Sequence, residues 1–546
     1  MLMEAALRDK GNRLGGLKMN IVNEAHFGRE LKVFEDRPQN LFSMLKESAR
    51  KYPEQEALVM NGVRLTYQEM QDKVEKIAGN LQSSMCVKKG DRVALLLGNS
   101  IEFCLLVFAC AKIGAIVVPL NTRLKENELS YMVEQSGAKI LFVDDEFLNK
   151  VENMRDEDST LSVQYFFLIG NQCPKRKDYL PYEILDQASS CVEIDVSEHD
   201  PLFIMYTSGT TGLPKGAIGS HLGAIHSSIN YQLVLESTNE ARTLIAVPLF
   251  HVTGLIGQLF HMVRVGGTSV IMRRYQTEEY IRLTFEENVT FLFNVPTIYI
   301  MMMSHADFSL YSYSKVNCIA YGGAPMSTET IYKLKKYFPN SYLHNAYGAT
   351  ETCSPATIMP RHYHESKFAS VGFPVPVGEM VVVDDEDHPC LPGEVGELLI
   401  KGPMVVEGYW NNEGANQTSF INGFWRSGDL AKIDQDGFIY IVDRKKDLIN
   451  RGGEKIFSIE VENVLYNHPK VLEAAVVGVP DSLFGEVVKA VIVPKDDQII
   501  DEQEIKDFVA EKLANYKVPK LIEFVSELPR NPAGKVLKTA LKNLQT

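Results

Sequence analysis

The stretch YTSGTTGLPKGAI at residues 206–218 gathers hydroxyl side chains around glycines and places a lysine behind them. Glycine lets the backbone approach a ligand closely, so N–H and O–H donors in such a run can surround a polyanion. The stretch therefore predicts a phosphate-binding loop. The residues concerned are Thr207, Ser208, Gly209, Thr210, Thr211 and Lys215.

This loop is not an ordinary P-loop. A Walker motif reads G-x-x-x-x-G-K-[ST]. Counted from Gly209, Pro214 takes the place of the second glycine and Gly216 takes the place of the magnesium-binding hydroxyl.

Length and composition indicate a multi-domain globular protein. The chain has 546 residues, of which 45% are hydrophobic and 23% charged, and at about 150 residues per domain two to four units are expected. The net charge of -14 disfavours nucleic acid and anionic lipid as partners. Eight cysteines without a C-x-x-C spacing favour reduced thiols and a cytoplasmic location.

No integral membrane segment is expected. The strongest candidate, IEFCLLVFACAKIGAIVVPL at residues 101–120, carries Glu102 and Lys112, so a buried helix that runs into a buried strand is favoured. The first twenty residues resemble no secretory signal, and Met19 is an alternative start.

The distribution of apolar runs predicts an α/β fold. Strand-like runs at 91–98, 114–120, 138–145 and 268–275 alternate with helical stretches, which is typical of layered, mostly parallel sheets with helices on both faces. From about residue 370, short strands with Gly and Asp turns predict a small β-barrel or sandwich subdomain. The last hundred residues predict a small α+β domain.

Four further motifs contain polar or charged residues that are candidates for a functional role. NAYGATET at 345–352 contains Glu351, and WRSGDL at 425–430 contains Asp429. VDRKKDLINRGGEKI at 442–456 is a basic, hinge-like segment, and LPRNPAGKVLK at 528–538 holds Lys535 on a Pro/Gly loop.

Together with the loop at 206–218, these motifs resemble the adenylate-forming superfamily, which includes acyl-CoA synthetases, luciferases and peptide-synthetase adenylation domains. The resemblance runs in order from about residue 40 to 540. It implies activation of a carboxylic acid with ATP and Mg²⁺, release of pyrophosphate, and transfer of the acyl group from acyl-AMP to CoA.

The resemblance also implies roles for individual residues. The loop at 206–218 would hold the β- and γ-phosphates, Glu351 would bind Mg²⁺, and Thr350 would contact the α-phosphate region. Lys535 would bridge the attacking carboxylate and the α-phosphate. The expected ribose and adenine neighbours are Asp429, Arg444, Tyr347, Gly323 and Asn345.

It further implies an N-terminal adenylation domain at 1–443, a hinge at 444–446 centred on Lys446, and a mobile C-terminal domain at 447–546. One pose would insert Lys535, and a second would bring Gly452, Gly453 and Lys455 to the site for the CoA step. The alternatives are that the GGEKI segment is only a solvated turn and that DRKKD is only a charged linker between domains.

The acid is not identified by the sequence. The expected pocket residues are neutral, which favours an uncharged tail and leaves fatty and aryl acids open. They are His251, Thr253, Asn294, Thr297, Tyr321, Ala346 and Cys353. For His251, a core histidine without contact to substrate is the alternative.

Three other classes compete with an acyl-CoA ligase. A carrier-protein-loading domain that activates amino acids should show an acidic residue in the pocket segment, but PLFHVTGLIGQLF at 248–260 has none. A luciferase-like oxygenase shares the adenylation motifs. A non-catalytic nucleotide- or carboxylate-binding relative should have lost Lys535, Glu351 or Asp429, and all three are present. A homodimer is left open.

Overall fold

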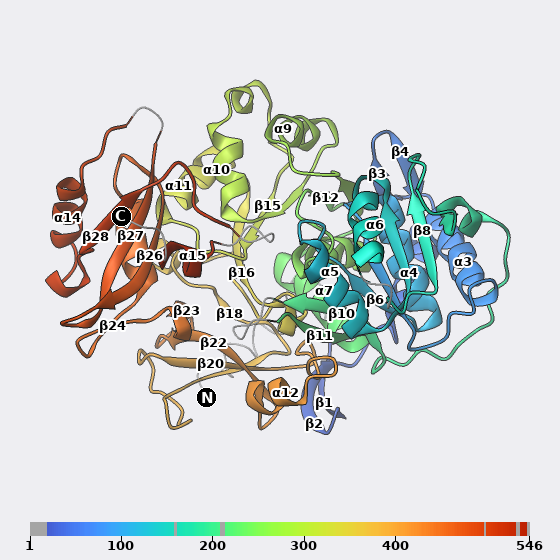
Figure 1. The fold of residues 1–546 in the computed structure, drawn as a ribbon, viewed down its shortest axis with the longest axis horizontal. Helices are drawn as coiled ribbons and strands as arrows, with labels where there is room; N and C mark the ends of the chain where they lie inside the picture. Colours follow the sequence, from blue (N-terminus) through green and yellow to red (C-terminus); the bar gives the residue numbers. More distant parts are fainter. Residues whose placement is uncertain (1–18, 158–160, 208–212, 496–497, 531–535, 543–546) are drawn as a thin grey trace.

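The computed structural model describes residues 19–157, 161–207, 213–495, 498–530 and 536–542. Two large sheets with their helices form most of the molecule, a smaller antiparallel sheet lies beside them, and a separate C-terminal domain follows (Figure 1). The α/β fold class expected from the apolar runs is confirmed. Loop residues 208–212 and Lys535 lie outside the described residues.

The first large sheet has seven strands in the order β11-β10-β6-β5-β7-β8-β9. All neighbouring strands run parallel except β10 and β11. Its strands are β5 (Arg92–Leu96), β6 (Ile116–Pro119), β7 (Ala138–Asp144), β8 (Tyr165–Ile169), β9 (Tyr179–Pro181), β10 (Pro201–Thr207) and β11 (Lys215–Ser220).

The second large sheet has nine strands in the order β18-β17-β16-β15-β14-β12-β13-β3-β4. The run from β16 to β3 is parallel. The strands are β3 (Glu56–Met60), β4 (Val63–Thr66), β12 (Arg242–Ile245), β13 (Thr268–Ile271), β14 (Phe291–Asn294), β15 (Cys318–Gly322), β16 (Tyr342–Tyr347), β17 (Thr357–Ile358) and β18 (Phe373–Pro374).

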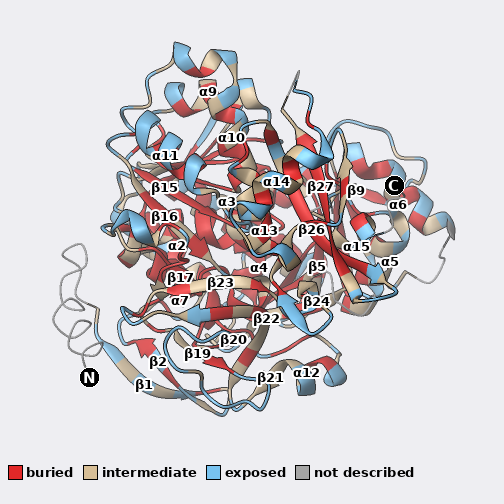
Figure 2. Ribbon diagram, turned by 90° about the vertical axis from the view of Figure 1, so that its left-hand side faces the viewer, coloured by how far each residue is buried: buried red, intermediate tan, exposed pale blue. Residues whose placement is uncertain are grey.

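Helices fill the space between these sheets and cover their outer faces. The main core joins the facing sides of both sheets to α2 (Leu41–Lys51), α3 (Tyr67–Ser83), α4 (Ile101–Ile113), α7 (His221–Leu235) and α8 (His261–Val265). A second core holds α9 (Thr277–Glu286), α10 (Pro296–Ser304) and α11 (Thr328–Tyr337), and a third holds α5 (Glu126–Ser136) and α6 (Leu148–Glu157). Figure 2 shows that the strands are mainly buried, whereas the outer turns of α9 and α11 are exposed.

Helix α4 shows why the apolar stretch at 101–120 is internal. Ser100 caps its first turn by accepting a hydrogen bond from the Phe103 N–H, and Gly114 ends it with a φ of 68°. Eleven of its thirteen residues are buried, and the chain continues directly into the buried strand β6. None of the helices in the described residues is long and apolar enough to span a membrane.

The antiparallel sheet follows β18 in the chain. It pairs β19 (Glu379–Val383), β20 (Gly396–Lys401), β22 (Phe424–Ile433) and β21 (Phe420–Ile421), and β23 (Ile439–Arg444) pairs with β22. α12 (Glu413–Ser419) precedes β21. The sequence predicts a barrel or sandwich here, and the described pairings are those of an open sheet.

The C-terminal domain has its own two hydrophobic clusters on the faces of one sheet. The sheet contains β24 (Ile449–Arg451), β25 (Glu454–Ile456), β26 (Val471–Asp481), β27 (Gly485–Pro494) and β28 (Leu521–Phe524). Its helices are α13 (Ser458–Tyr466), α14 (Glu502–Ala510) and α15 (Lys538–Lys542).

The remaining elements are short. β1 (Ile21–His26) and β2 (Arg29–Phe34) form a hairpin near the start of the described chain, and Thr253–Phe260 forms a π-helix, η3, directly before α8. The 3-10 turns are Asp145–Phe147, Tyr182–Asp186, Ala306–Leu310, Thr350–Thr352, Glu365–Lys367, Lys445–Asp447 and Asn515–Lys517.

Candidate functional site

The two ends of the hydroxyl-rich loop are held side by side. Thr207 closes β10, Lys215 opens β11, and the two residues are direct partners in the antiparallel register. The loop thus leaves and re-enters the edge of the first large sheet at one point. Ser208, Gly209, Thr210 and Thr211 lie outside the described residues.

Glu351 meets the base of this loop from the second large sheet. It sits in the 3-10 turn Thr350–Thr352 that follows β16, and it is only 9% exposed. Its Oε1 accepts hydrogen bonds from Tyr409 Oη at 2.9 Å and from Thr207 Oγ1 at 3.4 Å. Burial raises the pKa of the Glu351 carboxyl, although these donors oppose the shift.

Tyr409 is a site residue that the sequence did not reveal. Besides its hydrogen bond to Glu351, its ring lies 5.3 Å from Lys215 Nζ, and its backbone bridges to Ala217. The tyrosine therefore joins the carboxylate to the lysine of the loop. Its sequence context, EGYWN, resembles any surface turn, so only its contacts identify it.

Asp429 forms a second polar centre. It lies on β22 opposite Arg444 of β23, and it is only 5% exposed. Oδ2 accepts a hydrogen bond from Tyr347 Oη at 2.6 Å, and Oδ1 pairs with Arg444 Nε at 3.0 Å. Burial and the Asp429 charge raise the pKa of Tyr347 far above its ordinary value. The isolated motif reads as a turn, whereas the structure places this carboxylate on a strand.

The other residues expected around the nucleotide lie at the carboxyl ends of β15 and β16. Asn345 donates its side-chain amide to the Ser370 carbonyl at 3.0 Å. Gly323 follows β15 with a φ of 77° and is exposed, and Thr350 is half-buried beside Glu351. Ligands in open α/β sheets bind at such strand ends, where backbone groups are left unpaired.

The structure separates the residues expected in the acyl pocket. Asn294 and Tyr321 are register partners and share one face of the second sheet, where Asn294 Nδ2 donates to Tyr280 Oη at 2.6 Å. Ala346 pairs with Gly322, one residue further on, so it faces the main core together with Cys353. Side chains alternate between the faces of a strand, so these two pairs point to opposite sides of the sheet. Thr297, on α10, is half-buried.

His251 and Thr253 stand at the entrance to η3. The His251 ring lies 4.8 Å from that of Phe250, and its buried Nε2 has no hydrogen-bond partner in the part of the chain that the structure describes. Burial lowers the pKa of His251 to about 4, so the ring is neutral at physiological pH. π-helical turns are uncommon and often occur at functional sites.

The GGEKI segment contacts its own domain and Asp385, in the loop after β19, in this structure. Gly453 N–H donates to Asn450 Oδ1 at 3.0 Å, and Lys455 Nζ lies 3.8 Å from Asp385. Gly452 and Gly453 have φ values of 61° and 98°, and Lys446 is exposed in its 3-10 turn.

Polar contacts hold the C-terminal domain in this pose. Asp443, at the end of β23, accepts a hydrogen bond at 3.0 Å from Ser458 Oγ, the first residue of α13. Lys538 Nζ donates to the same Ser458 Oγ at 2.6 Å. The two domains therefore meet through buried contacts that bracket Lys446 in the chain.

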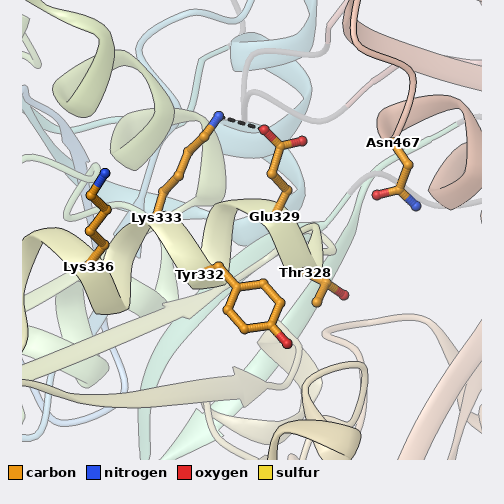
Figure 3. A pocket seen from close by; sticks show the side chains of 6 residues that line it. All are labelled: Thr328, Glu329, Tyr332, Lys333, Lys336 and Asn467. Atoms are coloured by element: carbon orange, nitrogen blue, oxygen red, sulfur yellow. Dashed lines mark ion pairs between the residues drawn. The ribbon is translucent and has the colours of Figure 1, made fainter.

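A groove of about 380 Å³ lies between α11 and the C-terminal domain (Figure 3). Lys333 and Glu329 of α11 form an ion pair of 2.7 Å on one side, and Asn467 stands on the other. None of the expected site residues that the structure describes lines it, so this groove is the gap between two domains rather than the candidate site.

Three groups among the described residues could hold a cation, and one of them, the cluster of Asp384, Glu386 and His388, is exposed. Within the described residues, both hydrogen bonds to Glu351 use Oε1, so Oε2 remains for a hard cation such as Mg²⁺. His26, Glu198 and His199 also place ligand atoms within 4.8 Å of one another. There, however, Arg37 Nε donates to Glu198 at 2.8 Å, so this cluster is an ion-pair anchor for the β1–β2 hairpin.

Comparison with protein families gives two matches in chain order. The profile of the AMP-binding enzyme family matches residues 45–410, and that of the AMP-binding enzyme C-terminal domain matches residues 460–535. Together they span most of the chain.

Individual relatives cover nearly the whole length. A 2-succinylbenzoate–CoA ligase of Bacillus licheniformis is 36% identical over 91% of this chain and 98% of its own. A feruloyl-CoA synthase of an Amycolatopsis species and a long-chain-fatty-acid–CoA ligase of Mycobacterium tuberculosis are each 34% identical over 92% of this chain and 98% of theirs.

Solved structures show the same likeness. The o-succinylbenzoate CoA synthetase of Bacillus subtilis in complex with its acyl-adenylate intermediate superposes with a TM-score of 0.81, at 32% identity, over 93% of this chain and 99% of that one. The same enzyme has been solved with ATP and a magnesium ion, with a TM-score of 0.80, at 32% identity, over 92% of this chain and 99% of that one.

Proposed function

This chain belongs to the AMP-binding enzyme family, and from that premise we propose that it is an ATP-dependent ligase that joins a carboxylic acid to CoA through an acyl-adenylate. One observation supports the proposal most strongly: Glu351, from the second large sheet, meets Thr207 at the base of the hydroxyl-rich loop of the first. A carboxylate at the rim of a phosphate loop suits a Mg²⁺–ATP substrate.

The chain's own residues would position the triphosphate. The loop at 206–218 would donate to the β- and γ-phosphate oxygens, and Lys215, held over the Tyr409 ring, would add a positive charge. Tyr409 and Thr207 fix the Glu351 carboxylate so that Oε2 is left to hold Mg²⁺. When bound, Mg²⁺ would neutralise charge on the phosphate oxygens as pyrophosphate departs.

Asp429 would bind the ribose. Its carboxylate accepts hydrogen bonds only, so it suits a pair of ribose hydroxyls. Tyr347 and Arg444 already hold both of its oxygens in place, which fixes the carboxylate before the nucleotide arrives. We assign Tyr347 and Arg444 as positioning residues, with Asn345 and Gly323 beside the adenine.

Two displacements complete the reaction. In the first, a carboxylate oxygen of the acid bonds to the α-phosphorus, the bond to the bridging oxygen breaks, and pyrophosphate leaves. In the second, the CoA thiolate attacks the acyl carbon and AMP leaves with the former carboxylate oxygen. Lys535 would stabilise the first transition state, where charge gathers on the α-phosphate.

We propose that the two steps use two poses of the C-terminal domain, with Lys446 as the hinge. The support is that Gly452, Gly453 and Lys455 contact their own domain and Asp385 here, away from Glu351. Thioester formation would require these residues to move toward the site.

Pyrophosphate release measured with ATP and a panel of carboxylic acids, with and without CoA, tests the proposal. The expected result is acid-dependent pyrophosphate release and, with CoA, a product of acyl-CoA mass together with AMP. Acyl-AMP that persists with CoA would favour a different acceptor, such as a carrier protein or oxygen. Binding of ATP without any pyrophosphate release would contradict a ligase.

A cytoplasmic location remains a proposal, supported by eight cysteines that are all free thiols. The homodimer also remains a hypothesis, which light scattering on the eluted protein would test.

A further inference from the structure

One face of α7 carries buried polar side chains whose hydrogen-bonding groups find no partner among the residues that the structure describes. Ser227 and Asn230 are both fully buried. Among the described residues, the Ser227 hydroxyl and both amide atoms of Asn230 make no hydrogen bond. Buried amides and hydroxyls are almost always satisfied in native proteins, because leaving them unpaired is costly. An amide with neither atom paired therefore needs a partner that the described chain does not supply, either a ligand or a buried water.

This face of α7 lies against the chain that follows Glu351. Gly223 and Asn230 are seven residues apart, or about two turns, so they share a side of the helix. A Cβ on Gly223 would lie 3.0 Å from Cys353 Sγ. Tyr231, next to Asn230, has its Oη 2.8 Å from Ser354 Oγ. The unpaired groups thus lie in the main core on the side of Cys353, two residues beyond Glu351.

His261 adds a third group to this region. It opens α8 and is fully buried, and its ring stacks on Tyr231 with the centroids 5.6 Å apart. Burial lowers its pKa to about 3, so the ring is neutral and offers one donor and one acceptor. The nearby Gly257 carbonyl can take only one of them.

The side chains of Ser227, Asn230 and His261 are polar and carry no charge. The hydroxyl, the primary amide and the imidazole lie in a core that is otherwise apolar, and Phe293 packs its ring 5.7 Å from that of Tyr231. Ser227, Asn230 and His261 provide no charge that could balance a second carboxylate. A plain hydrocarbon tail would leave the Ser227 hydroxyl, the Asn230 amide and one nitrogen of His261 unpaired. Sites built for hydrogen bonding reject such analogues far more strongly than apolar sites reject a methyl group.

We propose that the acid carries a neutral hydrogen-bonding group, such as a hydroxyl, carbonyl or amide, in the part of its tail that is remote from the reacting carboxylate. Ser227, Asn230 and His261 recognise this group. The proposal rests on the ligase function proposed above and narrows its substrate class. It excludes unsubstituted fatty acids as preferred substrates.

Matched pairs of acids test this substrate class. We would measure kcat/KM for pyrophosphate release with 4-hydroxycinnamate against 4-methylcinnamate, and with 10-hydroxydecanoate against undecanoate. Each pair differs by a hydroxyl in place of a methyl group. The expected result is a preference of about 10²-fold or more for the hydroxyl acid in at least one pair. Equal rates, or a preference for the methyl acid, in both pairs would overturn the proposal.

Substitutions on α7 assign the preference to these residues. Asn230→Leu should reduce the preference to about threefold or less, chiefly by lowering kcat/KM for the hydroxyl acid. Ser227→Ala should lower it less. The matched control is Ser228→Ala, because that neighbouring buried hydroxyl is already satisfied by the Ala224 carbonyl at 2.8 Å. A preference that survives both Asn230→Leu and Ser227→Ala would mean that buried water satisfies these groups, and would overturn the assignment.

Thermal unfolding of the same variants, without substrate, gives a second readout. Ser227→Ala should leave the Tm unchanged or raise it, because it removes an unpaired hydroxyl, whereas Ser228→Ala should lower it. A lower Tm in Ser227→Ala than in Ser228→Ala would contradict an unpaired Ser227. Pyrophosphate release with apolar acids alone overturns only this proposal, whereas no release with any acid overturns the ligase function on which it rests.

Discussion

Tyr347 donates a 2.6 Å hydrogen bond from its Oη to Oδ2 of Asp429, 82 residues further along the chain. The contact joins the last residue of β16 in the second large sheet to β22 in the antiparallel sheet. Arg444 holds the other oxygen of the same carboxylate. Two sheets therefore fix a single carboxylate at the position proposed for the ribose.

Removal of the Tyr347 hydroxyl should weaken nucleotide binding. Hydrogen bonds to charged groups contribute about 1.5–3 kcal/mol, so Tyr347→Phe is expected to raise the KM for ATP by about tenfold or more with little change in kcat. Tyr342→Phe, on the same strand, is the control, since that ring packs against Arg361 and His362. In Asp429→Ala, discrimination between ATP and 2′-deoxy-ATP should largely disappear, and retained discrimination would move the ribose elsewhere.

Glu351→Gln should impair adenylate formation and the response to Mg²⁺. The amide keeps the shape of the side chain but removes its charge, and loss of one such electrostatic contact commonly costs about 10²–10³ in rate. The measurement is acid-dependent pyrophosphate release over a range of Mg²⁺ concentrations. Glu365→Gln, at an exposed carboxylate near Tyr332, is the control. A variant with the parent's Mg²⁺ dependence would contradict the assignment.

The raised pKa of Glu351 predicts a pH effect on stability. A carboxyl whose pKa is raised by folding contributes stability that is present below its unfolded pKa and is lost as the pH rises through its folded pKa. Without Mg²⁺ at pH 7.5, Glu351→Gln should therefore be at least as stable as the parent. Mg²⁺ with ATP should raise the Tm of the parent more than that of the variant. The opposite order would show that Glu351 is stabilising as a bare carboxylate.

His251 substitutions should change the acid profile more than the affinity for ATP. The ring is neutral, because burial lowers its pKa to about 4. Its removal therefore changes the shape of the site and leaves the charge of the site unchanged. Each methylene of mismatch in an apolar pocket changes discrimination by about 1–3 kcal/mol, so the effect of His251→Ala should grade with acid size. An unchanged acid profile together with a raised KM for ATP would place His251 at the nucleotide instead.

Lys535→Ala should impair adenylate formation and spare thioester formation from supplied acyl-AMP. The expected loss in the first half-reaction is about 10²–10³. Lys535 lies outside the described residues, so this prediction rests on the sequence. Lys542→Ala, an exposed lysine at the end of α15, is the control. Equal losses in both half-reactions would contradict a role confined to the first.

Lys446→Pro should retain adenylate formation and lose much of the thioester step. Proline fixes φ near about −65° and removes the backbone N–H, so it tests whether the backbone must rotate at this position. Lys446→Ala is the matched control, because it removes the same side chain and leaves the backbone free. Acyl-CoA formation at the parent rate in Lys446→Pro would show that the pivot lies elsewhere.

The sequence by itself determined the fold class and the order of the motifs. Runs such as AKILFVDD at 138–145 and the capped apolar helix at 101–113 form the predicted elements because apolar periodicity, caps and glycines act over a few residues. The motifs at 206–218 and 345–352 also pointed to the family now shown by comparison. These are local signals, and local physics is sufficient to interpret them.

Only the tertiary structure decided which of these residues meet. It brought Tyr409 to Glu351. It also placed Tyr321 and Ala346 on opposite faces of one sheet, because Ala346 comes one residue after the register partner of Tyr321 and successive side chains of a strand point to opposite faces. It also left the Asn230 side chain fully buried without a hydrogen bond to any described residue. Burial and hydrogen-bond partners depend on segments that are far apart in the chain, so no local pattern in the sequence could reveal them.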